Sequence, residues 1–217
     1  MKVYGETIFD IIYLLLAAII GIYILINSKN KLGKLMGFAT IILGFGDAFH
    51  LVPRILSYFI DKDFTLYLGV GKLITSITMT IFYIFMYYIL EENYHLKNSK
   101  NKMIVWLFAI FRIILCLLPH NRWLTNNGSL LMGIIRNIPF TILGLLVIIW
   151  FYQNRKKDKI FKNIWFYITL SFIFYIPVVV GASSIPLLGM MMLPKTICYV
   201  IIILTFRKKV MSERNTK

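Results

Sequence analysis

Seven apolar runs, each about as long as the 20 residues that a helix needs to cross a bilayer, limit the fold of this chain more than any other feature. They cover residues 7–28, 35–60, 66–90, 103–119, 129–152, 163–183 and 187–206. The last two runs meet at the segment ASSIPLLG, in which Pro186 and Gly189 predict a tight turn. The pattern predicts an all-α polytopic membrane bundle of seven transmembrane helices, built as a single domain over residues 1–217.

Composition favours the bilayer over water as the solvent of this chain. Hydrophobic residues make up 59% of the 217 positions, and the mean hydropathy is +0.76. A soluble domain of this length has no core large enough to bury that much apolar surface, whereas lipid covers the apolar faces of a membrane bundle. We therefore expect a multi-pass protein of the cell membrane with the lipid bilayer as its main partner.

The basic residues predict an orientation. A net charge of +15 would suggest a nucleic-acid partner in a soluble protein, but here most basic residues lie in short loops between apolar runs, so no nucleic-acid partner is expected. Loops one, three and five and the C-terminal segment hold 16 of them, against three on the other side, Lys2, Lys62 and Arg122. The 16 are Lys29, Lys31, Lys34, Lys97, Lys100, Lys102, Arg155, Lys156, Lys157, Lys159, Lys162, Arg207, Lys208, Lys209, Arg214 and Lys217. The positive-inside rule then predicts an outside N-terminus and a cytoplasmic C-terminus.

Known cofactor and metal motifs are missing from the sequence. It contains no P-loop, no dinucleotide-binding fingerprint and no HExxH, so no cofactor is expected. The two cysteines, Cys116 and Cys198, lie in apolar runs without a CxxC spacing, and the three histidines are scattered, so no metal site is expected either. We expect both cysteines to be buried in the bundle, where a free thiol behaves as a small apolar side chain.

Five basic residues lie inside the apolar runs rather than between them. They are Arg54, Lys72, Arg112, Arg136 and Lys195, one each in the second, third, fourth, fifth and seventh run. A charge at mid-bilayer costs about 2.5–3.5 kcal/mol on insertion scales, so such residues usually face the bundle interior. Counted from the run ends at about 1.5 Å per residue, all five lie roughly 10 Å below the outer surface.

Polar residues accompany these cations at helical spacing. In GDAFHLVPRI, residues Asp47, His50 and Arg54 follow one another at i, i+3 and i+7, which places them on one helix face. We predict a polar cavity in the outer half of the bundle. The expected ligand contacts are Arg54, Lys72, Arg112, Arg136, Asn137, Tyr175, Lys195 and Tyr199.

The charge balance of this cavity favours an anionic ligand. Its acids would be Asp47, Asp10 and Glu6, fewer than its five cations. Buried cations without partners are costly, and a carboxylate, phosphate or lipid head group entering from outside would offset that cost. The leading interpretation is therefore a receptor or carrier for such an anion, with Asp47 orienting part of the cationic set and His50 donating a hydrogen bond.

Two further interpretations remain open at this point. In one, the protein is an intramembrane enzyme acting on a lipid or isoprenoid phosphate, with Asp47 and His50 as an acid–base pair. In the other, the protein serves assembly or acts as a partner subunit, and Asp47 forms a structural ion pair with Arg54 or Lys195. Single cations near helix ends, such as Lys72, also reach the interface by snorkelling. The sequence sets no oligomeric state.

At GDAFHLVPRI, RNIPF and LPKTICY the chain resembles a family of small uncharacterised seven-span bacterial integral membrane proteins. The resemblance covers most of the chain and implies the seven-helix fold but no particular activity. A looser similarity to microbial rhodopsins rests on the seven spans, Lys195 in the last one and FIFYIP at residues 172–177. It fails at Lys72, where a rhodopsin would carry an acidic counter-ion, and at Met191, where an acid would precede the lysine. No retinal is expected.

Overall fold

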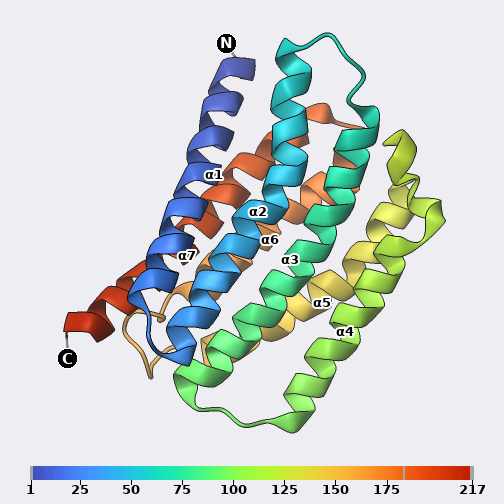
Figure 1. The fold of residues 1–217 in the computed structure, drawn as a ribbon. Helices are drawn as coiled ribbons and strands as arrows, with labels where there is room; N and C mark the ends of the chain where they lie inside the picture. The colour runs from blue at the N-terminus through green and yellow to red at the C-terminus, as the bar shows by residue number, and fades with distance from the viewer. Residues whose placement is uncertain (1, 183, 216–217) are drawn as a thin grey trace.

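The computed structural model of the protein describes residues 2–182 and 184–215, with no side-chain detail for Lys2 and Asn215. Ser183 of the predicted turn and Lys217 of the basic tail lie outside these described residues. Within them the chain is 86% helical and has no strand, so the all-α class is confirmed (Figure 1). The seven long helices are α1 (Lys2–Asn27), α2 (Lys31–Phe59), α3 (Thr65–Tyr94), α4 (Ser99–Leu117), α5 (Leu130–Asn154), α6 (Ile164–Gly181) and α7 (Met192–Asn215).

Several helices begin earlier than their apolar runs because polar caps start them. Asn30 accepts a hydrogen bond from the Gly33 N–H, so α2 begins at Lys31 rather than at residue 35. Asn98 accepts from the N–H groups of Lys100 and Asn101 and starts α4 at Ser99 rather than at residue 103. Hydropathy marks the apolar part of a helix, whereas the caps mark where its hydrogen bonding begins.

The expected tight turn at Pro186 and Gly189 is wrong. A short 3-10 helix, η3 (Pro186–Met191), follows Ile185 and leads directly into α7. Proline opens this segment because it lacks an N–H, and the first turn of a helix leaves that group without a partner in any case. As a result α7 begins only at Met192, and Lys195 lies in its first turn.

Six of the helices are long and apolar enough to cross a membrane, and they indicate a multi-pass membrane protein. The exception is α4, which carries three basic residues, Lys100, Lys102 and Arg112. It makes a seventh span only together with the short helices η1 (Pro119–Asn121) and η2 (Trp123–Thr125), which bend away from it by 66°.

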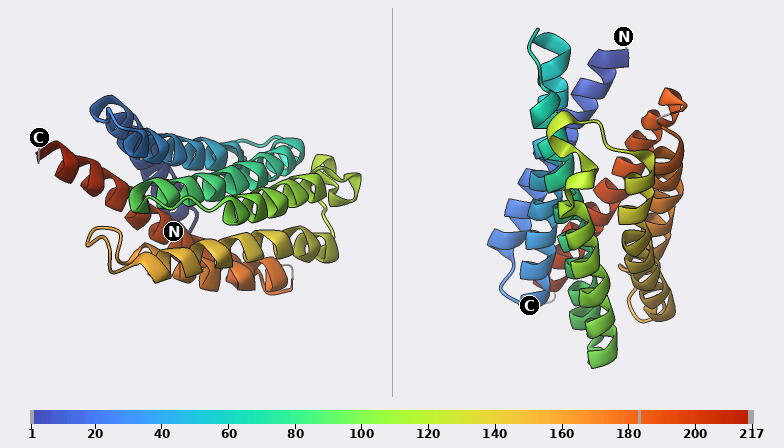
Figure 2. Two further views of the ribbon diagram at one scale, coloured as in Figure 1. Left: turned by 90° about the horizontal axis from the view of Figure 1, so that it is seen from below. Right: turned by 90° about the vertical axis from the view of Figure 1, so that its right-hand side faces the viewer.

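The helices form a closed ring in chain order, with α7 packed back against α1 (Figure 2). Helix α3 contacts α2, α4 and α5, and it supplies much of the buried core, including Phe82, Tyr83 and Met86. Large apolar side chains such as Ile19 and Leu107 are exposed on the outside of the bundle. An apolar exterior around an apolar core differs from the polar surface of a soluble protein and suits a surface covered by lipid.

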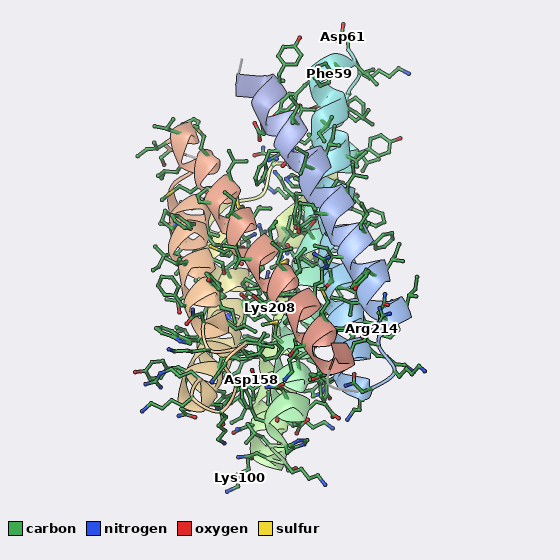
Figure 3. The ribbon with its side chains drawn as sticks, turned by 90° about the vertical axis from the view of Figure 1, so that its left-hand side faces the viewer. Phe59, Asp61, Lys100, Asp158, Lys208 and Arg214 are labelled. Carbon is green, nitrogen blue, oxygen red and sulfur yellow. The ribbon has the colours of Figure 1, made fainter. Side chains whose placement is uncertain are left out.

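The two ends of the bundle differ in charge. The N-terminus, Phe59 and Asp61 lie at one end (Figures 1 and 3). Lys100 lies at the opposite end, and Lys208 and Arg214 lie toward it (Figure 3). The loops with most of the basic residues therefore share an end with the C-terminus, as the alternation of the helices requires.

Candidate functional site

Two adjoining cavities inside the bundle hold the polar residues of the apolar runs. The first, of about 590 Å³, lies between α1, α2 and α7 and is lined by Glu6, Asp10, Asp47 and Arg54; we call it the mixed cavity. The second, of about 380 Å³, extends toward α3, α4 and α5, and we call it the basic cavity. Its polar lining includes Lys72, Ser76, Arg112, Ser129, Arg136, Asn137 and Tyr175. Five residues line both cavities and mark the boundary at which they meet, which we call the shared wall: His50, Thr75, Val178, Met192 and Lys195.

All five cations of the apolar runs thus lie at one or the other cavity, although each comes from a different helix. Arg54 lines the mixed cavity, and Lys72, Arg112 and Arg136 line the basic cavity. Lys195, in the first turn of α7, faces both. The five nevertheless differ in what they contact, and those contacts decide what the site can bind.

Arg54 is neutralised by carboxylates. Its Nη2 atom lies 2.7 Å from Asp10 Oδ2 and 3.2 Å from Glu6 Oε1. Asp10 is only 3% exposed, so the guanidinium stabilises a carboxylate that would otherwise be buried without a counter-charge. Helix α1 supplies both acids and α2 supplies the arginine. This triad of Glu6, Asp10 and Arg54 therefore links the two helices by ion pairs. Arg54 is therefore less available to an external anion than the other four cations.

Asp47 makes no ion pair among the described residues. Its Oδ2 atom accepts a hydrogen bond of 2.7 Å from the hydroxyl of Tyr13, and neither Arg54 nor Lys195 comes within 4.0 Å in the described structure. The structural ion pair expected as an alternative is therefore not formed. His50 leaves its Nδ1 atom buried without a hydrogen-bond partner, so the two side chains do not hydrogen-bond to each other through it.

Two cations of the basic cavity are held by amide oxygens from the segment between α4 and α5. Lys72 Nζ donates a hydrogen bond of 2.8 Å to Asn126 Oδ1. Arg136 Nη1 donates one of 2.8 Å to Asn121 Oδ1, and its guanidinium lies 4.4 Å from the centre of the Trp123 ring. An amide oxygen or an aromatic face carries a partial negative charge only, so these partners do not neutralise a positive charge on either residue.

Asn121 is itself fixed by the backbone around it. Its Nδ2 atom donates to the carbonyl oxygens of Leu115, Cys116 and Leu118 at 2.8, 3.2 and 2.9 Å. With the amide nitrogen committed to these acceptors, Oδ1 is the atom that turns toward Arg136. These carbonyls belong to the end of α4, where the helix itself supplies no donors.

Arg112 and Lys195 contact aromatic rings. The Arg112 guanidinium lies 3.4 Å from the centre of the Phe140 ring, and the Lys195 ammonium lies 4.9 Å from that of Tyr175. Arg112 is only 2% exposed, and its Nε and Nη1 atoms have no hydrogen-bond partner among the described residues. No carboxylate lines the basic cavity as far as the described residues show. The cavity thus holds a cluster of four cations whose partners, over residues 2–182 and 184–215, are all neutral.

Of the remaining predicted residues, two reach the cavity and one does not. Asn137 and Tyr175 line it and are joined by a hydrogen bond of 2.7 Å from the Tyr175 hydroxyl to Asn137 Oδ1. Tyr199 is 3% exposed and shares a hydrogen bond with the Tyr83 hydroxyl in the core, where its ring lies 5.5 Å from the Lys195 ammonium. It therefore supports Lys195 instead of lining the cavity.

Sequence reasoning missed the residues that hold the cations. Asn121, Trp123 and Asn126 are not among the site residues that the sequence predicts. The segment HNRWLTNNG contains three asparagines within eight residues, which is an unusual supply of amide groups for a loop between two apolar runs.

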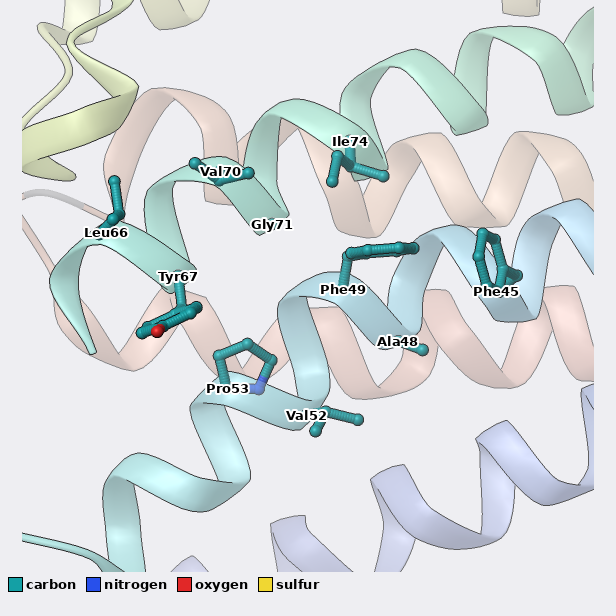
Figure 4. A pocket seen from close by; sticks show the side chains of 10 residues that line it. All are labelled: Phe45, Ala48, Phe49, Val52, Pro53, Leu66, Tyr67, Val70, Gly71 and Ile74. Carbon is teal, nitrogen blue, oxygen red and sulfur yellow. The ribbon is translucent and has the colours of Figure 1, made fainter. Parts of the chain in front are cut away.

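A third hollow differs from both cavities in its chemistry. It lies on the surface between α2 and α3, with a volume of about 580 Å³, and no charged residue lines it (Figure 4). Phe45, Phe49 and Val52 form one side, and Val70 and Ile74 form the other. Phe45 is 62% exposed, so this groove belongs to the apolar exterior of the bundle.

Comparison with family models, with curated proteins and with solved structures finds no match for this chain. The resemblance to small seven-span bacterial membrane proteins therefore stays an expectation from the sequence.

Proposed function

We propose that the protein binds an anionic ligand, with a carboxylate, a phosphate or a lipid head group, in the basic cavity, as a receptor or carrier. The observation that carries this proposal is the environment of Arg112. Its guanidinium is buried and has no carboxylate partner, and two of its nitrogens have no hydrogen-bond acceptor among the described residues. A buried charge left in this state is costly, and an anion in the cavity supplies both the missing charge and the missing acceptors.

The other three cations support the same ligand class. Within the described part of the chain, Lys72, Arg136 and Lys195 have only amide or aromatic partners, so their charges add to that of Arg112 over a small volume. Arginine pairs with the planar oxygens of a carboxylate or phosphate through two hydrogen bonds, and lysine adds a point charge. The N-terminus of α5 begins beside the cavity at Leu130 and contributes a further partial positive charge.

We also propose the finer topology of a cell-membrane protein with seven spans, an outside N-terminus and a cytoplasmic C-terminus. The distribution of basic residues supports it, and the cavities lie toward the N-terminal end of the bundle, so the ligand would enter from outside. The variants Lys62→Cys and Lys157→Cys, each treated with an impermeant thiol reagent in intact cells, test the arrangement. Labelling of Lys62→Cys alone supports it, and labelling of Lys157→Cys alone reverses it.

Ligand binding is tested on the purified full-length protein in detergent. Inorganic phosphate, citrate and short-chain lipid phosphates are titrated while the melting temperature is followed, since a bound ligand stabilises the folded state by mass action. We expect stabilisation of the wild type and its loss in Arg112→Leu. Lys100→Leu, which removes a charge at the opposite end of the bundle, is the matched control and should respond like the wild type. A wild-type protein that no anion stabilises, and from which native mass spectrometry releases no bound anion, would contradict the proposal.

A further inference from the structure

The carboxylates of the two cavities all lie on one side of the shared wall. Glu6, Asp10 and Asp47 line the mixed cavity, whereas no acid lines the basic cavity within the described residues. The wall between them carries Lys195 and His50, which face both spaces. A ligand that extends past this wall would meet cations at one end and a carboxylate at the other.

Building on the proposed function, we infer that the ligand is a zwitterion, with its anionic group in the basic cavity and an ammonium group against Asp47. Glu6 and Asp10 already share Arg54, at 3.2 and 2.7 Å. Asp47 is the remaining acid of the mixed cavity, and among the described residues it has a hydrogen bond from Tyr13 but no cation within 4.0 Å.

The chemistry of Asp47 selects an amine. A carboxylate accepts up to about four hydrogen bonds, and Tyr13 supplies one, so an ammonium group with three N–H donors finds free acceptor positions there. It also supplies the counter-charge that the described protein groups do not place in contact with Asp47. A second anionic group on the ligand would instead meet the Asp47 carboxylate and be repelled, which disfavours dicarboxylates and diphosphates.

The residues of the shared wall indicate what kind of linker would join the anionic group and the ammonium group of the ligand. Val178 and Met192 are shared by both cavities, and Leu51 and Leu193 line the mixed cavity next to them. A short apolar linker between the anionic group and the amine would pack against these side chains. The shared chemistry is that of an aminoalkyl phosphate or amino carboxylate, either as a free solute or as the head group of an aminophospholipid.

Two soluble probes that differ only at the amine test the inference on the full-length wild-type protein. O-phosphoethanolamine carries the ammonium group, and propyl phosphate has a methyl group in its place. We expect O-phosphoethanolamine to bind about tenfold or more tightly than propyl phosphate, because a hydrogen-bonded charge pair at Asp47 is formed with the first probe only. Isothermal titration calorimetry measures both affinities, and this comparison needs no variant.

Variants then assign the preference to Asp47. In Asp47→Asn the two affinities should converge, whereas Tyr13→Phe should retain the preference because it leaves the carboxylate in place. A parallel measurement in nanodiscs compares phosphatidylethanolamine with phosphatidylpropanol. Preference for the amine in the lipid pair but not in the soluble pair identifies a head group as the source, and preference in the soluble pair identifies a free solute.

The outcomes separate the inference from the proposed function. If O-phosphoethanolamine and propyl phosphate bind the wild type equally, and the two lipids do as well, the zwitterion is overturned while anion binding stands. If no soluble probe and no lipid binds, and neither inorganic phosphate nor citrate stabilises the protein, the proposed function fails with it. A preference for the amine that survives in Asp47→Asn would overturn the assignment of the ammonium group to Asp47.

Discussion

The guanidinium of Arg112 lies over the Phe140 ring, 3.4 Å from its centre, so its neighbour there is an aromatic side chain and not an acid. A cation over an aromatic ring gains roughly 2 kcal/mol or more when both are removed from water. That gain is small beside the several kcal/mol that burying an ion costs. Phe140 therefore orients Arg112 without neutralising its charge.

Replacing Arg112 with leucine should leave the unliganded protein as stable as before or more stable. Exchanging buried charges for apolar side chains of similar volume is often neutral or stabilising by about 1–4 kcal/mol. Asp47→Asn should act in the opposite direction, because it replaces the carboxylate that accepts a charge-assisted hydrogen bond of 2.7 Å from the Tyr13 hydroxyl. Thermal melts in detergent without added anion compare the two variants. A lower melting temperature for Arg112→Leu than for Asp47→Asn would contradict this reading, and a bound anion should narrow the gap.

Arg54→Gln should be strongly destabilising, in contrast to Arg112→Leu. It leaves Asp10, whose side chain is 4% exposed, without its counter-charge, at a cost of about 3–5 kcal/mol. The double variant Asp10→Asn/Arg54→Gln should recover part of that loss, since the buried carboxylate of Asp10 is then no longer left without its arginine. Denaturation of the wild type, both single variants and the double variant measures the coupling. Additive losses would show that the triad does not fasten α1 to α2.

The loop between α5 and α6 should give the protein an acid-sensitive contact. Burial raises the pKa of Asp158, but hydrogen bonds from Lys209 Nζ and the Ile160 N–H outweigh it, so the pKa lies below its ordinary value of 3.8. A carboxyl group with a lowered pKa adds stability above its unfolded pKa and loses it as the pH falls through the folded pKa. Asp158→Asn should therefore reduce stability at neutral pH and flatten the decline below about pH 4. Melting temperatures from pH 3 to pH 7 test this, and a parallel shift at every pH would contradict it.

Gly71→Ala should disturb the contact between α2 and α3. A Cβ atom at this position would collide with the backbone carbonyl of Phe49 and the Cα of His50, which cannot move aside as a side chain can. We expect a loss of more than about 2 kcal/mol, beyond the overpacking cost of an ordinary core site, and an altered position of His50. Gly5→Ala is the matched control, because the space around that helical glycine is open, and it should be neutral or stabilising by up to about 1 kcal/mol. Equal melting temperatures for the two variants would contradict the close approach.

The helices could be predicted because bilayer thickness and apolar run length are directly related. Their ends could not be placed from hydropathy, since Asn30 and Asn98 begin helices by hydrogen bonding outside the apolar runs. The 3-10 helix at Pro186 was missed because a proline between two apolar runs favours a turn as much as a short helix.

The positions of the site residues followed from the cost of placing charges in apolar runs, but their partners did not. Which acid meets Arg54 depends on how α1 packs on α2, and a single sequence contains no distance between helices. Arg136 and Lys72 donate hydrogen bonds to amide oxygens of the segment between α4 and α5. These contacts depend on how that segment folds, which the sequence alone does not give. The sequence therefore predicts which residues face inward better than it predicts which charges are balanced.

The three hydrogen bonds from Asn121 Nδ2 to the carbonyls at the end of α4 also constrain how this protein can change by mutation. Asn121→Asp needs only one nucleotide change and would bring a neutralising carboxylate to Arg136. The same change would turn an oxygen toward three carbonyl oxygens that now receive a donor, so it would repel them and leave the helix end unsatisfied. The hydrogen bonds that hold the loop to the end of α4 therefore disfavour this way of neutralising Arg136.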